Sequence, residues 1–173
     1  MKSRGYLSAA LGGAVILLSV CTSSCSSASS ASDEADIRAL EKSYVDAFNA
    51  KDTKAMMAVY SPDESLVAFD AIPPRQYVGF NAYKKDNEDF VAAFPGPIKV
   101  EQIDWKIETD GTLGYGHGFL HAVLTDKDGK QLDSTVRMTD VYRKINGKWL
   151  IVHEHLSFPV DMATGKADLT SKP

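Results

Sequence analysis

The part of this sequence that shows regular hydrophobic periodicity, from Asp33 onward, contains no cysteine. The chain of 173 residues has two cysteines, Cys21 and Cys25, and both precede that part. Their position excludes disulfides, thiol catalysis and cysteine metal sites from the domain that follows. The remaining length corresponds to one domain with a hydrophobic core.

Positive charge is also scarce. The chain has 19 lysines and arginines against 23 aspartates and glutamates, a formal net charge of −4, and the two signs are interspersed. A surface that binds nucleic acid needs a basic excess or a basic stripe to contact phosphates. We therefore expect no nucleic-acid partner.

Long apolar runs are absent except near the N-terminus. Lys2 and Arg4 precede an apolar stretch from Tyr6 to Val20, which is shorter than the roughly 20 residues that a membrane-spanning helix needs. A positively charged start followed by a short apolar stretch is typical of a signal peptide. We predict that residues 1–32 are a signal peptide and a Ser-rich tether, and that the protein is exported to the periplasm or the bacterial envelope.

The tether leaves two forms of the mature protein open. The segment CTSSCSSASSAS resembles the tether of bacterial lipoproteins, which carry a lipid on a cysteine at this place, although Val20 and Thr22 depart from the usual lipobox. Cleavage after Ala28 or Ala31 would instead release a soluble protein. Any membrane contact is thus expected only through an N-terminal lipid anchor.

Hydrophobic spacing predicts three helices in the first half of the domain. The first begins near Asp33, with acidic residues in its first turn, and the second is short and has Asp52 as its N-cap. The third covers about residues 81–94 and ends at a Pro-Gly-Pro sequence. The apolar positions of the first two are Ile37, Leu40, Tyr44, Ala47, Phe48, Met56, Met57 and Tyr60.

After Pro97 the hydrophobic period changes from helical to alternating, which is typical of strands. Turn dipeptides separate the strands at 110–111, 128–129 and 146–147, and Asp-Gly and Asn-Gly are strong hairpin signals. We predict an α+β domain over residues 33–160, with helices on one face of a curved antiparallel sheet, followed by a loose tail over 161–173.

Two hairpins define a strand register if both turns are two-residue loops. The turn at 146–147 then pairs Asp140 with His153, and the turn at 128–129 pairs Asp140 with His117. Directly opposed residues have Cβ atoms about 4.5–5.5 Å apart, so Asp140 would lie between two imidazoles. This register puts all four histidines on one face, and it holds only without a bulge, because one extra residue reverses the faces beyond it.

The turn at 110–111 already points to such an irregularity. A two-residue loop there would direct Ile103, Trp105 and Ile107 away from the core. We therefore expect a longer loop or a bulge in this strand, and Asp104 is a minor site candidate.

The chain resembles a known superfamily over roughly residues 33–159. The segments EKSYVDAFNAKDTKAMMAVYSPD and TDVYRKINGKWLIVHEH are similar to the nuclear transport factor 2-like superfamily, in its SnoaL-like (ketosteroid-isomerase-like) branch. The final hairpin also resembles the association domain of calcium/calmodulin-dependent protein kinase II. The resemblance implies a cone-shaped sheet whose concave face is closed by three helices and encloses a pocket.

The same resemblance suggests site residues. The association domain projects two arginines into its pocket, and the matching positions here are His117 and Asp140, so its ligand preference is not carried over. Ketosteroid-isomerase-like members place an acid on a pocket strand as general base, and Asp140 or Asp70 matches that role. Dehydratase-like members pair a histidine with an acid on the first helix, where this chain offers Asp46 and Asn49.

The predicted catalytic group is His117 as acid/base, Asp140 as its partner or as the base itself, and His153 as a second orienting group. The same three residues can equally form a polar cluster that only shapes the pocket. A metal triad is a third interpretation, but the superfamily mostly works without metals, so we expect neither metal nor cofactor. The predicted substrate-binding residues are Tyr44, Asp70, Tyr115, Phe119, Met138, Tyr142, Trp149, Ile151 and His155.

Two functions are consistent with such a pocket. One is cofactor-free acid/base chemistry of the isomerase, dehydratase or lyase type on a small apolar or aromatic substrate. The other is non-catalytic ligand binding by an exported or lipid-anchored domain. On the opposite sheet face, Arg137, Arg143 and Glu154 interrupt apolar residues, and we expect that face to form a homodimer.

Overall fold

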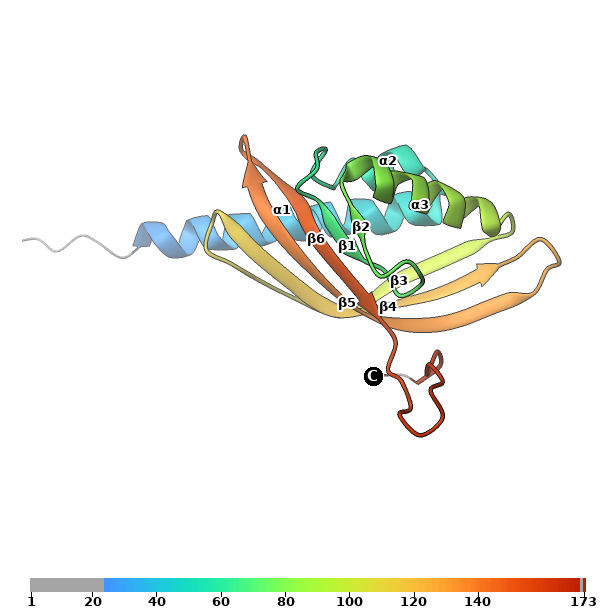
Figure 1. Ribbon diagram of the computed structural model, residues 1–173. Helices are drawn as coiled ribbons and strands as arrows, with labels where there is room; N and C mark the ends of the chain where they lie inside the picture. Colours follow the sequence, from blue (N-terminus) through green and yellow to red (C-terminus); the bar gives the residue numbers. More distant parts are fainter. Residues whose placement is uncertain (1–23, 172) are drawn as a thin grey trace, which may run out of the picture.

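A computed structural model describes residues 24–171 and 173 as three helices packed on one mixed sheet of six strands (Figure 1). The strand order is β2-β1-β6-β5-β4-β3, and β1 is parallel to β6 while the other neighbours are antiparallel. The elements are α1 (Ser24–Asn49), α2 (Thr53–Met57), β1 (Val67–Phe69), β2 (Tyr77–Val78), α3 (Phe80–Ala93), β3 (Ile98–Thr109), β4 (Leu113–Thr125), β5 (Gln131–Ile145) and β6 (Lys148–Ser157).

The predicted α+β fold is confirmed: the helices lie together on one side of a strongly curved sheet, and the chain after β6 hangs below the other side (Figure 1). The predicted signal segment up to residue 23 lies outside the described residues. Within the described part of the chain, no helix is long and apolar enough to cross a membrane.

Local sequence signals explain the helix boundaries. Asp52 caps α2, and its Oδ1 accepts a hydrogen bond from the Ala55 amide at 2.9 Å, as expected for an N-cap. Lys51 connects the C-terminal ends of α1 and α3. It follows α1 in the chain, and its ammonium donates to the carbonyls of Phe94 and Pro95, just after α3, at 2.7 and 2.8 Å. One boundary differs: α1 begins at Ser24, so the segment 24–32, predicted as a tether, is helical. Extending an existing helix is easy because nucleation is the costly step.

The hairpin between β4 and β5 has a longer loop than predicted. Thr125 pairs with Gln131, and His117 pairs with Thr139 while Gly116 pairs with Asp140. The cause is Asp126, whose Oδ1 accepts hydrogen bonds from the amides of residues 128 and 130 at 2.9 Å each. An aspartate that binds backbone amides ahead of it closes a wider loop than Asp-Gly alone does. The predicted pairing of His117 with Asp140 is therefore wrong by one residue.

A bulge in β6 changes the register a second time. The turn at 146–147 is a two-residue loop as predicted, with Ile145 opposite Lys148, but between Tyr142–Ile151 and Val141–His153 the strand contains one extra residue, Val152. Beyond it Asp140 pairs with Glu154 rather than His153. The bulge therefore turns Glu154 to the inner face and the neighbouring histidines to the outer face.

The irregularity expected in β3 is present. The register shifts between residues 103 and 106, and Asp104 in the bulge has a φ of 52°. Trp105 and Ile107 consequently pack toward the core, as expected, whereas Ile103 pairs with Phe119 on the outer face.

Two glycines of β4 let large side chains occupy one half of the cone. A Cβ at Gly116 would lie 2.5 Å from the Tyr142 hydroxyl and 2.8 Å from the Trp105 ring, and a Cβ at Gly118 would lie 2.9 Å from the same ring. We call this region, bounded by residues 37–41, 105–118, 138–145 and 148–154, the closed half. The open half is bounded by residues 44–48, 70–72, 83–90, 120–136 and 156–158.

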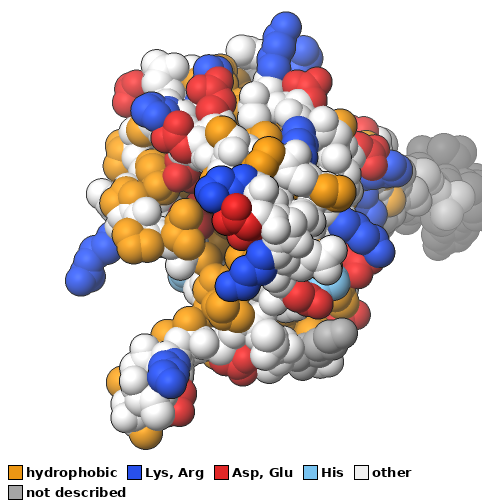
Figure 2. Space-filling view, turned by 90° about the vertical axis from the view of Figure 1, so that its right-hand side faces the viewer, with side chains coloured by type: hydrophobic (Ala, Val, Ile, Leu, Met, Phe, Trp, Pro, Cys, Tyr) orange, Lys and Arg blue, Asp and Glu red, His pale blue; other side chains and the backbone are white. Residues whose placement is uncertain are grey.

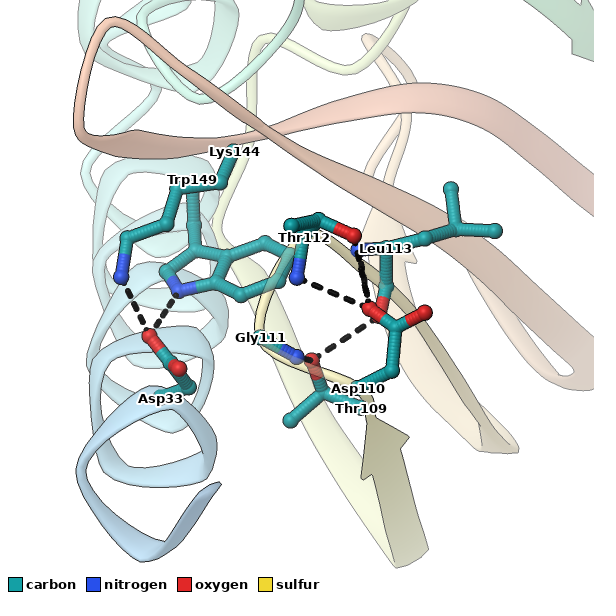
Figure 3. Close-up of polar contacts among 8 residues, drawn as sticks. All are labelled: Asp33, Thr109, Asp110, Gly111, Thr112, Leu113, Lys144 and Trp149. Atoms are coloured by element: carbon teal, nitrogen blue, oxygen red, sulfur yellow. Dashed lines mark hydrogen bonds and ion pairs between the residues drawn. The ribbon is translucent and has the colours of Figure 1, made fainter. Parts of the chain in front are cut away.

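The far end of the closed half is held by Asp33 on α1 (Figure 3). Its Oδ1 accepts hydrogen bonds from the Lys144 ammonium at 2.5 Å and from the Trp149 indole at 3.0 Å. These bonds lower the pKa of the Asp33 carboxyl. In the adjacent β3–β4 turn, the Asp110 carboxylate accepts from the amides of Thr112 and Leu113 at 2.8 Å each. The Asp33 contacts tie α1 to β5 and β6, and the Asp110 contacts close the turn beside them.

Candidate functional site

The histidines that the sequence places in the pocket lie on the outer face of the sheet. His117 is exposed there, its ring stacks on Tyr115 at a centroid distance of 6.2 Å, and one sheet row contains His117, Thr139 and His155. The expected row of His117, Asp140 and His153 is therefore not formed, because each neighbouring strand is displaced by one residue relative to β5.

The remaining histidines have structural partners. His153 Nδ1 lies 2.8 Å from the Val67 carbonyl, where β1 joins the sheet, and Phe69 packs edge-on against the rings of His153 and His155. His121 bridges the Glu101 and Asp133 carboxylates at 3.1 and 2.9 Å, and these two acids raise its pKa. The imidazoles thus tie strands together outside the cone.

The predicted substrate-binding residues divide into three groups. Met138, Tyr142, Trp149 and Ile151 lie inside as predicted, but they are packed in the core of the closed half. Tyr44 and Asp70 line a cavity in the open half. Tyr115, Phe119 and His155 belong to the outer face, so the prediction that they line the pocket is wrong. The cause is again the one-residue displacement of β4 and β6 relative to β5.

The open half contains a cavity of about 130 Å³ between α1, α3 and the sheet. Figure 2 looks onto the end of the molecule where the β4–β5 turn lies, and hydrophobic side chains gather there between the helices and the sheet. Such a concave apolar site with a few polar groups is the usual form of a small-molecule pocket. The apolar lining consists of Tyr44, Phe48, Ala71, Ile72, Tyr83, Phe90, Leu120, Ala122, Leu124, Leu132, Val136, Leu156 and Phe158.

Two carboxyl groups interrupt this apolar wall. Asp70 follows β1, Asp86 lies on α3, and the Tyr77 hydroxyl donates to Asp86 Oδ1 at 2.5 Å. Burial and, after it, the neighbouring negative charge of Asp86 together raise the pKa of Asp70 to about 6. Burial also raises the pKa of Tyr77, together with its hydrogen bond to Asp86. Asp70 is therefore a carboxyl group that changes charge near neutral pH beside an apolar cavity.

Asp70 also borders a second depression on the other side of its loop. That depression is shallow and includes Arg75 and His155. In the described part of the chain, neither of these side chains forms an ion pair with Asp70. The carboxyl group thus lies at the boundary between the cavity and the outer surface.

A second set of acids is buried in the closed half. Asp140 and Glu154 are opposed across β5 and β6, and Glu41 approaches Asp140 from α1; all three are at most 1% exposed. Glu41 accepts hydrogen bonds from Tyr142 and Gln102 at 2.6 and 2.5 Å. This carboxyl row does not line the cavity.

Glu154 has partners of its own at the other end of the carboxyl row. It accepts from the Tyr60 hydroxyl at 2.7 Å and from the Tyr83 hydroxyl. Burial raises the pKa of Glu154 to about 7, against the effect of these two donors. The rings of Tyr44, Tyr60 and Tyr83 pack edge to face and separate the carboxyl row from the cavity.

Asp140, at the centre of the row, has no donor to either carboxyl oxygen within the described structure. Complete burial raises its pKa strongly, and the negative charges of Glu41 and Glu154 act in the same direction. The neutral acid is the form that such a site stabilises, because an unpaired buried charge is very costly.

Sequence reasoning missed Glu41, Asp86 and the inward direction of Glu154. Glu41 carries a readable signal, since it occupies an inward position between Ile37 and Tyr44 on the apolar stripe of α1. The sequence of β4 carries a second signal, which concerns the direction of its histidines. The apolar residues Leu120, Ala122 and Leu124 occupy even positions and the histidines odd ones, so the two sets face opposite sides of the sheet. No comparable local signal marks the bulge at Val152.

The described residues also bear on the metal interpretation. Within residues 24–171, no three His, Cys, Asp or Glu side chains come together in a group that could hold a metal ion. On the outer face, β5 lies between the two histidines of β4, His117 and His121, and the two of β6, His153 and His155.

Comparisons with known proteins agree with this architecture. An NTF2-like protein of unknown function from Pseudomonas putida KT2440 is 32% identical, with a TM-score of 0.76 over 83% of this chain and 99% of that chain. A Xanthomonas campestris protein, provisionally described as a calcium/calmodulin-dependent protein kinase II association domain, is 25% identical, with a TM-score of 0.61 over 70% of this chain and 84% of that chain.

More distant similarity extends to a Novosphingobium aromaticivorans protein, provisionally described as a scytalone dehydratase. It is 16% identical, with a TM-score of 0.64 over 75% of this chain and 86% of that chain, and at this identity the likeness concerns the fold. A comparison with curated proteins gave no significant match. The model of the SnoaL-like domain matches residues 37–161. The chain therefore belongs to the SnoaL-like family and has the NTF2-like fold.

Proposed function

We propose that this protein binds a small, largely apolar molecule in the open half of the cone and transfers a proton on it, with Asp70 as the acid/base. The observation that carries the proposal is a titratable carboxyl group, with a pKa of about 6, in the wall of an apolar cavity. A general base is most effective when its pKa lies near the working pH. The reaction class is isomerisation, dehydration or elimination.

Access to the cavity favours Asp70 over the residues named from the sequence. Asp140 is fully buried and separated from the cavity by tyrosines, and His117 and His153 belong to the outer face. A catalytic group must reach the proton that it moves. Asp70 meets this requirement, and Tyr83 in the same wall presents a ring beside it.

The chemistry follows from the charge states of Asp70. Above pH 6 the ionised carboxylate removes a proton from a carbon beside an electron-withdrawing group such as a carbonyl, and the resulting acid returns the proton to the same molecule. Asp86 keeps Asp70 basic by its negative charge. The apolar walls exclude water, which strengthens electrostatic effects on the substrate.

A deuterium-exchange experiment tests this function without knowledge of the natural substrate. A panel of small aryl ketones, neutral and charged, is incubated with the protein in D2O, and exchange at the carbon beside the carbonyl is followed by NMR. We expect exchange that falls by about 10²–10⁴ in Asp70→Asn, the range lost with a general base. Asp89→Asn is the matched control, because Asp89 lies on α3 but is exposed and paired with Lys85.

The competing function is ligand binding without catalysis. Saturable binding of panel members with no protein-dependent exchange would establish it and exclude Asp70 as a working base. Exchange that Asp70→Asn leaves unchanged would move the base elsewhere in the molecule.

We also propose that the protein forms a homodimer through the outer face of the sheet. Leu113, Tyr115 and Phe69 are 45%, 42% and 36% exposed on or beside this face, and exposed apolar side chains of this kind are typical of interfaces. Light scattering after size exclusion tests the assembly: Tyr115→Asp is expected to convert a dimer to a monomer, and a wild-type monomer would contradict it.

Export is proposed from the N-terminal sequence alone. Lys2, Arg4 and the apolar stretch that follows support a signal peptide, and Cys21 or Cys25 would carry a lipid if the protein is anchored. Mass spectrometry of the mature N-terminus distinguishes an acylated cysteine, cleavage after Ala28 or Ala31, and an unprocessed chain. The unprocessed chain would contradict export.

A further inference from the structure

We propose that the ligand of the open half is a hydrophobic amine, bound as an ammonium ion with its charge at Asp70 and Asp86 and its apolar body in the cavity. This inference rests on the proposed function, since it names the substrate class of the same site.

The charges around the cavity have one sign. Among the described residues that line it, Asp70 and Asp86 are acidic and none is Lys, Arg or His. The other charged residues of α3 pair with one another instead, Lys84 with Glu88 and Lys85 with Asp89, at 2.5 and 2.6 Å. Neither Asp70 nor Asp86 has an ion-pair partner in the part of the chain that the structure describes.

Both carboxyl groups lie in the wall of the same cavity. Burial disfavours the ionised form of Asp70, and the negative charge of Asp86 acts in the same direction. Tyr77 donates to one oxygen of Asp86 but brings no positive charge. A cation placed between the two carboxylates removes the repulsion, whereas an anionic ligand would add a third negative charge.

Aromatic rings complete a site for an organic cation. Tyr83, Phe90 and Tyr44 line the same cavity, and Tyr77 packs against Tyr83 at a centroid distance of 5.7 Å. The faces of aromatic rings attract ammonium groups, and the rings also pack against apolar carbon. A metal ion would use only the carboxylates, while an amine with an apolar body uses the carboxylates and the walls together.

Three matched ligands test the class directly. We compare 2-phenylethylamine, 2-phenylethanol and phenylacetate by isothermal titration calorimetry on the purified protein at pH 7.5, because they share one ring and differ in charge. We expect the amine to bind at least about tenfold more tightly than the alcohol, as for a charge-assisted hydrogen bond out of water. Phenylacetate is expected to bind most weakly of the three.

Two variants and a measurement of the protons released on binding show whether the carboxylate charges or only the shape of the cavity determine amine affinity. Asp70→Asn and Asp86→Asn should each lower amine affinity about tenfold and leave the alcohol nearly unchanged, while Asp89→Asn should leave both unchanged. Titrations near pH 6 in buffers of different ionisation enthalpy should show proton release on amine binding, because the cation favours ionised Asp70. The charged and titratable groups that surround Asp70 are Asp86, Tyr77, Tyr83, Glu154, Arg75 and His155.

Each result is decisive. An alcohol or phenylacetate that binds as tightly as the amine overturns the amine class and leaves the proposed pocket intact. An amine preference that survives both Asp→Asn variants also overturns it. If none of the three ligands binds, the amine class and the small-molecule pocket are both wrong.

Discussion

The two halves of the cone use acidic side chains in opposite ways. In the closed half, Glu41, Asp140 and Glu154 are fully buried among tyrosines, in a region filled by Trp105 and Tyr142. In the open half, Asp70 and Asp86 stand at the wall of a cavity lined by apolar residues. Carboxyl groups away from bulk water therefore occur in both halves, and those of the open half line the cavity that we propose as the ligand site.

The difference shows why a perturbed pKa does not by itself identify a site. Burial raises the pKa of Asp140 as it raises that of Asp70, yet Asp140 does not line the cavity. Structural networks and active sites perturb ionisation by the same physical causes. Access from solvent separates the two cases, and the following changes test that separation.

The largest loss of folding stability is expected from overpacking the closed half. A valine at Gly116 brings carbon within 2.5 Å of the Tyr142 hydroxyl and 2.8 Å of the Trp105 ring, and overpacking of a filled core costs about 3 kcal/mol or more. Urea denaturation of Gly116→Val measures the loss. Thr139→Val, on the exposed outer face, is the control and should change stability by less than about 0.5 kcal/mol. Equal stability of both variants would mean that the closed half is not tightly packed.

A smaller loss is expected when one donor to the carboxyl row is removed. Tyr60→Phe takes away the hydroxyl that donates to Glu154 at 2.7 Å, and an unsatisfied buried carboxylate costs about 1–3 kcal/mol. The double variant Tyr60→Phe/Glu154→Gln should recover part of that loss in the same urea titration. Additive losses would show that the two side chains do not act together.

The pH dependence of stability tests the proton on Asp140. Its folded pKa is raised above the unfolded value, so the folded state holds more protons and loses stability as pH rises from the unfolded pKa toward the folded one. The loss is roughly 1 kcal/mol per pH unit for one such group. Asp140→Asn keeps a hydrogen-bond donor at this position but has no ionisable carboxyl group. Its stability relative to wild type should therefore increase with pH between 5 and 8. Urea denaturation of both proteins across that range measures this difference. A constant difference would mean that Asp140 is ionised in the folded protein.

The smallest effect is expected at the outer-face histidines. His117→Ala removes an exposed ring that stacks on Tyr115, and exposed substitutions usually change stability by less than about 0.5 kcal/mol. Deuterium exchange of the aryl ketones should keep the wild-type rate. A loss comparable to that of Asp70→Asn would return the catalytic role to this histidine.

The sequence predicts the fold more completely than the site because the two depend on different signals. Helical spacing, the Asp52 cap and the Asn-Gly turn act locally, so all three helices and the last hairpin could be predicted. The site depends on which side chains of each strand point inward, and one extra residue in a turn or strand reverses this direction. Asp126 widens one turn, and Val152 bulges where Glu154 meets Tyr60 and Tyr83, contacts that are distant in sequence.

We propose that ligand binds in the open half of the cone and not in the closed half or on the outer face of the sheet. Backbone NMR shifts on titration with 2-phenylethylamine test it most directly. We expect saturable shifts that cluster at Ala71, Asp86, Ala122 and Leu124, around the cavity. Shifts that cluster instead at Asp140 and Glu41, or at His117 and Thr139, would contradict it.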